Sequence, residues 1–326
     1  MKVQLCHTFE DLASLENLFL AWQEFLVDKK KTKEIILFSR NLIDNIYHLH
    51  EDLISLKYTH GGYKRFSICD PKPRIIHKAL VRDRLLHHAI YRILYPFFNR
   101  TFIADSFSCR VGKGTPPAAI DRLRSFAYKV SKNHTRTCWI LKCDIRKFFD
   151  NIDQAILLKI LSQYILDSNI RWLLEKVIKS FDSGKADIGL PLGNLTSHLF
   201  VNIYMNVFDQ FVKHKLKAQY YIRYADDFIL LSNDKHWLLG ELSRIGAFLQ
   251  AQLGLSLHPN KVILQTFASG VDFLGWINFS DHRVLRTKTR KRMIKRINAH
   301  PTEVTIRSYL GLMSHGNSYK LCKRVL

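Results

Sequence analysis

The chain has 326 residues, of which 47% are hydrophobic, and a formal net charge of +22. This length and apolar content are sufficient for a folded protein with a substantial core, arranged as one large domain or as roughly two to three smaller ones. The charge is uneven, since residues 1–60 contain seven Lys or Arg against nine Asp or Glu, which leaves +24 for residues 61–326. Such an excess repels itself unless phosphates neutralise it. The composition therefore favours a nucleic-acid partner, with a membrane surface as the competing explanation.

Membrane-spanning, secreted and zinc-binding proteins are disfavoured by simple features of the sequence. No apolar run has the length of a spanning helix, and Glu10 and Asp11 interrupt the N-terminus where a signal peptide would be apolar. We therefore expect a soluble, cytoplasmic protein. The cysteines include no CxxC pair and no zinc-finger spacing, which predicts reduced thiols in the core. They are Cys6, Cys69, Cys109, Cys138, Cys143 and Cys322.

The first sixty residues are predicted to be helical. Residues 8–27 have an amphipathic pattern, with Thr8 as a candidate N-cap and Asp11 at the position that completes a capping box. A second helical pattern covers residues 34–56. We interpret residues 1–60 as a helical N-terminal extension without catalytic residues.

A basic hairpin is predicted next. The segment GGYKRFSICDPKPRIIH indicates two short strands, Lys64–Ile68 and Arg74–His77, joined by a turn that Asp70, Pro71 and Pro73 enforce. Such a hairpin is suited either to hold a triphosphate, with an arginine as a bidentate ligand, or simply to contact a nucleic-acid backbone. Its cations are Lys64, Arg65, Lys72 and Arg74.

The segment TCWILKCDIRKFFDNID follows two predicted helices, of which the first covers residues 81–98 and the second begins after a Gly/Pro loop. Its apolar strand, Trp139–Leu141, leads to Asp144, and Phe149 stands five residues later. An acid at the end of a buried strand is well placed to bind a metal ion. A bulky ring just beyond it is well placed to form the floor of a nucleotide pocket.

The stretch YYIRYADDFILLS contains two adjacent acids between two strand-like segments, so Asp226 and Asp227 are expected at a hairpin tip. Paired carboxylates at such a place repel each other and lose solvation, and both effects are unfavourable. A bound divalent cation such as Mg²⁺ would compensate for them. For the dipeptide alone, a solvated surface turn is the alternative. Upstream, the loop Gly189–His198 opens a predicted helix over residues 197–217, and its glycines allow the backbone to approach a ligand closely.

The C-terminal part combines further ordered elements with a strong basic excess. A helix is predicted over residues 236–253, then Lys261 within GLSLHPNK is placed to reach a phosphate, and VDFLGW predicts a strand over 271–276. The last 44 residues hold twelve Lys or Arg and one acid, and are predicted to form two or three short helices that follow a nucleic-acid backbone. The candidate contacts are Arg286, Lys288, Arg290, Lys291, Arg292, Lys295 and Arg296.

From Tyr63 onward these stretches, taken in order, resemble a reverse transcriptase. The matching pieces are the hairpin with Arg74 eight residues before RDR, Asp144 with Phe149, the GLPLGNLTS loop, the YADD box, the GLxLxxxK pattern that ends in Lys261, and FLG. The resemblance implies an α+β, right-hand polymerase fold. Its parts would be the helical extension (1–60), fingers and palm (61–283) and a basic helical thumb (284–326).

The resemblance also implies roles for particular residues. Asp144, Asp226 and Asp227, with the backbone carbonyl of Ile145, would bind two Mg²⁺ ions. Phe149 would act as the gate against the 2′-hydroxyl of ribonucleotides. Further nucleotide contacts would come from Arg74 with Lys64 or Arg65, from Lys72 and Lys261, and from Leu192 and Gly193 under the nascent base pair.

A more specific resemblance rests on Leu192-Gly193-Asn194-Leu195-Thr196-Ser197, because many reverse transcriptases carry QGxxxSP in this loop. An aliphatic residue followed by GNxxS is similar to the enzymes of diversity-generating retroelements, although His198 replaces their usual Gln. That subtype implies a bacterial or phage enzyme that copies a template RNA into cDNA with errors at adenines. It also implies deoxynucleoside triphosphates, an RNA/cDNA duplex and an accessory variability protein as partners. The alternatives are a retron-like or group II intron-like enzyme of ordinary fidelity, and a non-catalytic RNA-binding protein.

Overall fold

The computed structural model describes residues 3–27, 29, 32–69 and 73–323. Within these ranges the chain forms two compact units, and each is assembled from separate stretches of sequence. The first unit comprises residues 1–103, 146–211 and 247–256. The second unit comprises residues 104–145, 212–246 and 257–326. The predicted division into extension, fingers with palm, and thumb follows the sequence rather than these units, and it stays a prediction.

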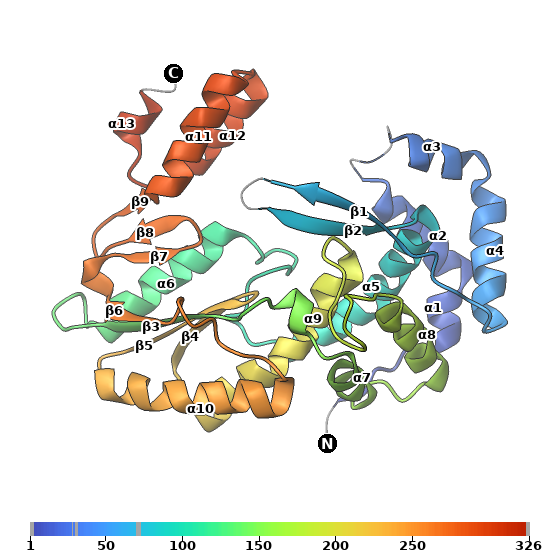
Figure 1. Ribbon diagram of the computed structural model, residues 1–326, viewed down its shortest axis with the longest axis horizontal. Helices are drawn as coiled ribbons and strands as arrows, with labels where there is room; N and C mark the ends of the chain where they lie inside the picture. The colour runs from blue at the N-terminus through green and yellow to red at the C-terminus, as the bar shows by residue number, and fades with distance from the viewer. Residues whose placement is uncertain (1–2, 28, 30–31, 70–72, 324–326) are drawn as a thin grey trace. The chain divides into compact units, whose positions relative to one another are not determined.

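The first unit is mainly helical, and α2 and α9 both pack on α5 (Figure 1). Completely buried residues such as Leu18 of α2 and Leu86 and Leu94 of α5 contribute to its core. Its helices are α1 (Phe9–Ala13), α2 (Leu15–Phe25), α3 (Lys33–Arg40), α4 (Leu42–Ile54), α5 (Val81–Thr101), α7 (Gln154–Ser162), α8 (Ser168–Lys179) and α9 (Leu195–Gln210).

Both predicted N-terminal helices are interrupted. The capping box is confirmed, since the Thr8 hydroxyl accepts a hydrogen bond from the Asp11 amide and the Asp11 carboxylate accepts one from the Thr8 amide. The predicted helix over residues 8–27 is nevertheless two helices, because Ser14 leaves the helical conformation and caps α2. Asn41 also leaves the helical conformation and divides the second predicted helix into α3 and α4, although its side chain makes no capping hydrogen bond.

The predicted basic hairpin is confirmed. Strands β1 (Tyr63–Ile68) and β2 (Arg74–Ala79) pair antiparallel, with Arg65 opposite His77. Of the predicted turn residues, Asp70 and Pro71 lie outside the described residues, as does Lys72.

The second unit is built on a four-stranded antiparallel sheet with strand order β4-β5-β3-β6. Helix α6 (Pro116–Val130) covers one face, and the first part of α10 (Lys235–Leu253) covers the other (Figure 1). Leu123 and Phe126 of α6 form one core with Ile140, Ile222 and Ile229 of the sheet. The strands are β3 (Trp139–Asp144), β4 (Tyr220–Tyr224), β5 (Asp227–Ser232) and β6 (Ile263–Thr266).

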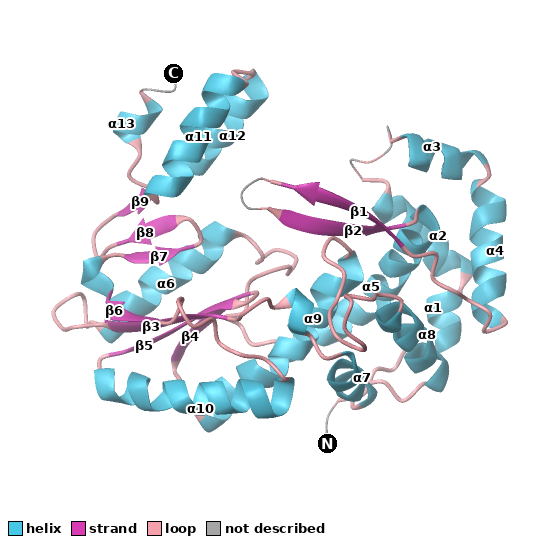
Figure 2. Cartoon of the chain, viewed as in Figure 1, coloured by secondary structure: helices cyan, strands magenta, loops and turns pink. Residues whose placement is uncertain are grey.

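A small three-stranded sheet follows, and here one prediction is wrong. VDFLGW is not one strand, because Leu274 (φ 51°) and Gly275 (φ 90°) adopt left-handed conformations and turn the chain between two strands. The strands are β7 (Val271–Phe273), β8 (Trp276–Asn278) and β9 (Arg283–Leu285). Three short helices then confirm the expected C-terminal arrangement (Figure 2): α11 (Thr287–Ala299), α12 (Glu303–Met313) and α13 (Tyr319–Cys322).

Two further expectations can be compared with the structure. No helix among the described residues is long and apolar enough to cross a membrane. All six cysteines are free thiols, as expected, and Cys138 and Cys143 are buried. The prediction of core thiols is wrong for Cys6, Cys69 and Cys109, which are exposed.

Candidate active site

The structure brings the three predicted catalytic acids together at one end of the sheet in the second unit. Asp144 is the last residue of β3 and lies directly opposite Asp227, the first residue of β5. Facing residues of antiparallel strands have Cα atoms only about 5 Å apart. Asp226 immediately precedes β5, and its carbonyl oxygen accepts a hydrogen bond from the Ile145 amide at 3.2 Å. Residues that are some eighty positions apart in sequence therefore meet because two strands pair.

The turn that carries two of these acids, residues 225–227 and hereafter the acid turn, is held by a buried arginine. Ala225 has φ 55°, a left-handed conformation that alanine rarely adopts. The Arg223 guanidinium, only 1% exposed, donates hydrogen bonds to the Ala225 carbonyl at 3.1 Å and to Ser106 Oγ at 3.0 Å. Arg223 is not among the residues predicted from the sequence, although a charged residue within the apolar strand YYIRY was an available signal.

Two lysines lie against the acids. Lys142, two residues before Asp144, places Nζ 3.3 Å from Asp227 Oδ2 and donates a hydrogen bond to the Asp272 carbonyl at 2.6 Å. Lys261 places Nζ 2.8 Å from Asp144 Oδ2, and its side chain is 44% exposed. Lys261 was predicted to bind phosphate, and that role stays a prediction because the described contact is with a carboxylate.

The pKa of Asp227 is raised to about 7, chiefly by burial and also by the neighbouring Asp226 and Asp144, while Lys142 opposes the change. One oxygen, Asp227 Oδ1, is buried without a hydrogen-bond partner among the described residues. A buried carboxylate with like charges beside it and an unpaired oxygen is a place where an added cation is strongly stabilising.

The acids fit a hard divalent cation, although they do not form a ready-made site. Among the described residues, no group of three His, Cys, Asp or Glu side chains is arranged to hold a metal ion as it stands. The donor chemistry is nevertheless that of Mg²⁺ sites, since the paired ends of β3 and β5 and the adjoining turn carry three carboxylates. One oxygen of Asp144 is paired with Lys261, whose side chain is 44% exposed.

Four of the predicted nucleotide-binding residues line one cavity in the first unit. They are Arg65, Arg74, Phe149 and Leu192, and the cavity has a volume of about 830 Å³. Its position follows from the β1–β2 hairpin, which forms one wall, and from the short helical turn that begins at Phe149. Phe149 thus lines a cavity, and its role beside a nucleotide stays a prediction.

The hairpin is attached to the glycine-containing loop by specific contacts. The His77 amide donates a hydrogen bond to the Leu192 carbonyl at 2.9 Å, and Asn194 Nδ2 donates one to the His77 carbonyl at 2.8 Å. Gly193 has φ +111°, and a Cβ atom there would lie 2.6 Å from Ile76 Cγ2. Glycine is thus required at this position by the hairpin as well as by the backbone conformation.

The remaining candidates are placed less favourably for this cavity. Lys64 is exposed and does not line it, as expected when Arg65 does, because successive side chains of a strand point to opposite faces. Lys72 lies outside the described residues. Lys147 and Lys185 line the cavity but were missed in the sequence, since single lysines outside a recognised motif give no signal. Burial, with Arg65 adding to it, lowers the pKa of His77, which also lines the cavity.

The reverse transcriptase (RNA-dependent DNA polymerase) family model matches residues 68–278, which is more than half of the chain. The chain belongs to the reverse transcriptase family. This membership confirms the resemblance deduced from the ordered motifs.

This chain is similar to several intron-encoded proteins. It is 22% identical over 309 residues to the putative COX1/OXI3 intron 2 protein of Saccharomyces cerevisiae, covering 74% of this chain and 33% of the relative. It is 24% identical over 280 residues to the group II intron-encoded protein LtrA of Lactococcus lactis, covering 64% of this chain and 44% of the relative. The chain thus spans less than half the length of these relatives.

A solved structure supports the fold. Telomerase from Candida albicans, in complex with a TWJ fragment of telomeric RNA, is similar with a TM-score of 0.53 and 14% identity, covering 70% of this chain and 46% of that one. The predicted α+β polymerase fold is confirmed by this likeness and by the family match.

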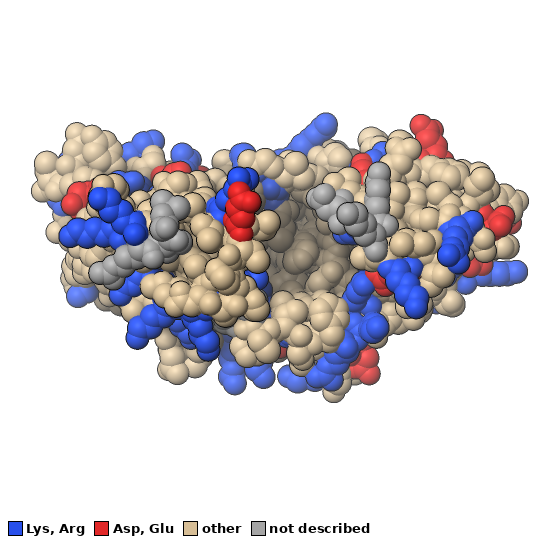
Figure 3. All heavy atoms as spheres, turned by 90° about the horizontal axis from the view of Figure 1, so that it is seen from above, with Lys and Arg blue, Asp and Glu red and all other residues tan. Residues whose placement is uncertain are grey.

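The C-terminal helices of this reverse transcriptase carry the predicted basic surface. Helix α11 buries Thr289, Met293 and Ile297 on one stripe, which leaves its cations on the other faces. Arg286, just before the helix, pairs with Asp272 at 3.2 Å. Lys288, Arg290, Lys291, Lys295 and Arg296 are exposed, and Arg292 is half-buried. On the face drawn in Figure 3, Lys and Arg side chains are far more numerous than Asp and Glu, in keeping with the net charge of +22.

Proposed function

We propose that the chain is an RNA-directed DNA polymerase, which extends a primer on an RNA template with deoxynucleoside triphosphates. The observation that carries the proposal is the placement of Asp144 and Asp227 on facing strand ends, with Asp226 in the adjoining turn. A structural scaffold does not require three clustered carboxylates, one of them with a pKa raised to about 7. A phosphoryl-transfer site requires such carboxylates to hold metal ions. The template RNA and the RNA/cDNA duplex would be the partners of the basic C-terminal surface.

In this proposal, the groups around the acid turn, with the metal ions that they would hold, keep the reacting groups in place and neutralise their charge. Asp144, Asp226, Asp227 and the carbonyl of Ile145 would hold two Mg²⁺ ions, which supply Lewis-acid activation of the primer hydroxyl and neutralise the departing pyrophosphate. Lys142 keeps a positive charge beside Asp227, which favours its ionised form. Lys261 leaves Asp144 and offers its ammonium group to the triphosphate.

The cavity in the first unit is proposed to receive the incoming nucleotide. It presents four cations, Arg65, Arg74, Lys147 and Lys185, against two acids, Asp150 and Asp182, so its lining has a net positive charge that favours a triphosphate. Phe149 lines the same cavity and would exclude a 2′-hydroxyl. The preference for deoxynucleotides would then be steric.

Primer extension on an RNA template in the presence of Mg²⁺ tests the proposal. Wild-type protein should extend the primer, and Asp226→Asn should lose extension while binding the primer and template unchanged. Binding without extension by the wild type would instead support a non-catalytic RNA-binding protein.

We further propose low fidelity at template adenines, as in diversity-generating retroelements, on the evidence of the LGNLTS loop. Leu192 lines the nucleotide cavity and offers no hydrogen bond where many reverse transcriptases carry Gln. Leu192→Gln should therefore lower the error rate at template adenines in cDNA made on a defined template containing all four bases. An unchanged error spectrum, or high fidelity in the wild type, would favour the alternative of an ordinary-fidelity enzyme, to which the intron-encoded relatives point.

The same subtype proposal includes a small accessory variability protein, docked on the basic surface. The support is charge alone, because a surface with this excess of Lys and Arg attracts an acidic partner. Charge-reversing substitutions on α11 should weaken such a complex. They should also make its binding constant depend less steeply on salt concentration.

A further inference from the structure

We propose that the second unit contains an additional RNA site, a pocket that binds one unpaired nucleotide at the end of the β4–β5 hairpin opposite the acid turn. Tyr220 pairs with Leu231 at this end, whereas Tyr224 pairs with Asp227 at the acid turn. With a rise of about 3.3 Å per residue, the two ends are separated by roughly 13 Å. The pocket is therefore distinct from the acids, and the inference relies on the proposed function only in naming RNA as the ligand.

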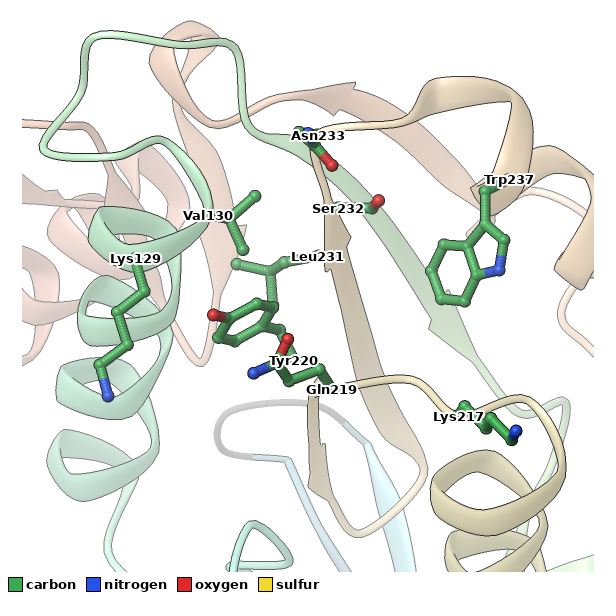
Figure 4. A pocket seen from close by; sticks show the side chains of 9 residues that line it. All are labelled: Lys129, Val130, Lys217, Gln219, Tyr220, Leu231, Ser232, Asn233 and Trp237. Atoms are coloured by element: carbon green, nitrogen blue, oxygen red, sulfur yellow. The ribbon is translucent and has the colours of Figure 1, made fainter.

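The pocket is small and lies between the two helices that cover the sheet. Its volume is about 290 Å³, near the lower end of the range of about 300–1,000 Å³ for small-molecule pockets. Figure 4 shows Val130 of α6, Leu231 of β5 and the Tyr220 ring close together, with Trp237 of α10 on the other side of β5. This size suits a single nucleoside rather than a larger ligand.

Two half-buried aromatic rings, Tyr220 and Trp237, line the pocket. Trp237 lies in the first turn of α10, where the Asp234 carboxylate accepts hydrogen bonds from the amides of His236 and Trp237 at 2.8 and 3.0 Å. The Tyr220 ring packs edge-to-face against Phe126, with centroids 5.2 Å apart. Aromatic rings that line an open pocket are the groups on which unpaired bases stack, at about 1–3 kcal/mol per base.

Two lysines flank the rings. In Figure 4 the Tyr220 ring lies between Lys129, on the left, and Lys217, on the right, where Trp237 lies above Lys217. Within the described part of the chain, neither ammonium group pairs with an acid. A strand of RNA crossing the pocket would thus place phosphates near both lysines and a base near the rings.

The backbone that presents Lys217 is also fixed. Lys213 donates hydrogen bonds from Nζ to the carbonyls of Ala218 and Gln219, at 3.0 and 2.9 Å. Lys217 itself adopts φ 54°. The side-chain amides of Gln219 and Asn233 complete the lining and offer both donors and acceptors to the edge of a base.

The surroundings of the pocket favour a polyanion over a small neutral ligand. Residues 129–136, 213–219 and 232–237 contain seven Lys or Arg and one acid. That acid, Asp234, is occupied in capping α10. Aromatic stacking of exposed bases combined with phosphate contacts is how proteins recognise unpaired RNA, whereas duplex RNA hides its base faces.

The test is equilibrium binding of an unstructured ten-nucleotide RNA and of a ten-base-pair RNA duplex to the full chain in EDTA, followed by fluorescence anisotropy. Trp237→Leu should weaken binding of the unpaired RNA by 5-fold to 100-fold and leave duplex binding unchanged, and Trp237→Phe should restore most of the loss. Lys129→Gln with Lys217→Gln should reduce the slope of log K against log salt by about 1.4, at 0.7 per phosphate contact on a single strand. Arg171→Gln with Lys176→Gln, two exposed cations of α8, is the matched control.

A crosslinking measurement keeps the proposal testable if Trp237→Leu does not fold. Wild-type protein irradiated with RNA containing 4-thiouridine should yield a crosslinked peptide that includes Tyr220 or Trp237. Equal losses for unpaired and duplex RNA, equal effects of the α8 control, or no crosslink to this segment would each overturn the proposal. Primer extension is scored separately, so a chain that binds here but does not polymerise would refute only the proposed activity.

Discussion

Replacing Asp227 by Asn should stabilise the metal-free protein at alkaline pH. Burial raises the pKa of Asp227 from 3.8 to about 7. The folded protein therefore binds this proton more tightly than the unfolded chain does. The stability that the group contributes is complete below pH 4 and is lost as the pH rises through 7. Asn has the same shape, does not titrate, and retains an oxygen that can accept a hydrogen bond from Lys142.

The size of the effect follows from the shift in pKa. Between pH 5 and pH 8, the wild type should lose roughly 2–3 kcal/mol more unfolding free energy than Asp227→Asn, at 1.36 kcal/mol per pKa unit. The assay is urea unfolding of both proteins at the two pH values in EDTA, repeated with Mg²⁺ at pH 8. Added Mg²⁺ should stabilise the wild type more than the variant, because only the wild type offers the carboxylate. A difference between the two proteins that does not change with pH would refute the reasoning.

Three further predictions follow from the described contacts. Phe149→Val should reduce the preference for a deoxynucleotide over the ribonucleotide at least tenfold in kcat/KM, and unchanged discrimination would remove the gate assignment. Gly193→Ala should lower the unfolding free energy by about 1–3 kcal/mol, since its Cβ would lie 2.6 Å from Ile76 Cγ2; Gly62→Ala, at φ +80° with no atom within 4 Å, is the control for backbone strain alone. Arg223→Met should cost about 1–3 kcal/mol in urea unfolding, because it leaves the carbonyl of the acid turn without its donor; unchanged stability would show that the turn holds without it.

The elements that could be predicted from the sequence are those specified by local pattern. The β1–β2 and β4–β5 hairpins follow from strand-like segments on both sides of a turn, and these strands position Arg74 and the acid turn. The pairing of Asp144 with Asp227 is long-range, and it was predictable only because the motifs occur in the order of a known family.

The features that were missed depend on single backbone conformations or on tertiary contacts. The apolar periodicity of the first helix continues across Ser14, so the pattern does not reveal the break there. Leu274 in a left-handed conformation is equally unexpected from its side chain, although the glycine after it was a signal for a turn. The contact of Lys261 with Asp144 joins residues 117 positions apart, and no local pattern specifies it.

Single-turnover addition of one deoxynucleotide to an RNA-templated primer most directly tests whether the acid turn is the polymerase centre. Wild type and the exposed-acid control Asp281→Asn should add the nucleotide at the same rate in Mg²⁺, whereas Asp144→Asn should be slower by at least a thousandfold without loss of primer binding. Comparable rates for all three proteins would contradict the assignment of the catalytic acids.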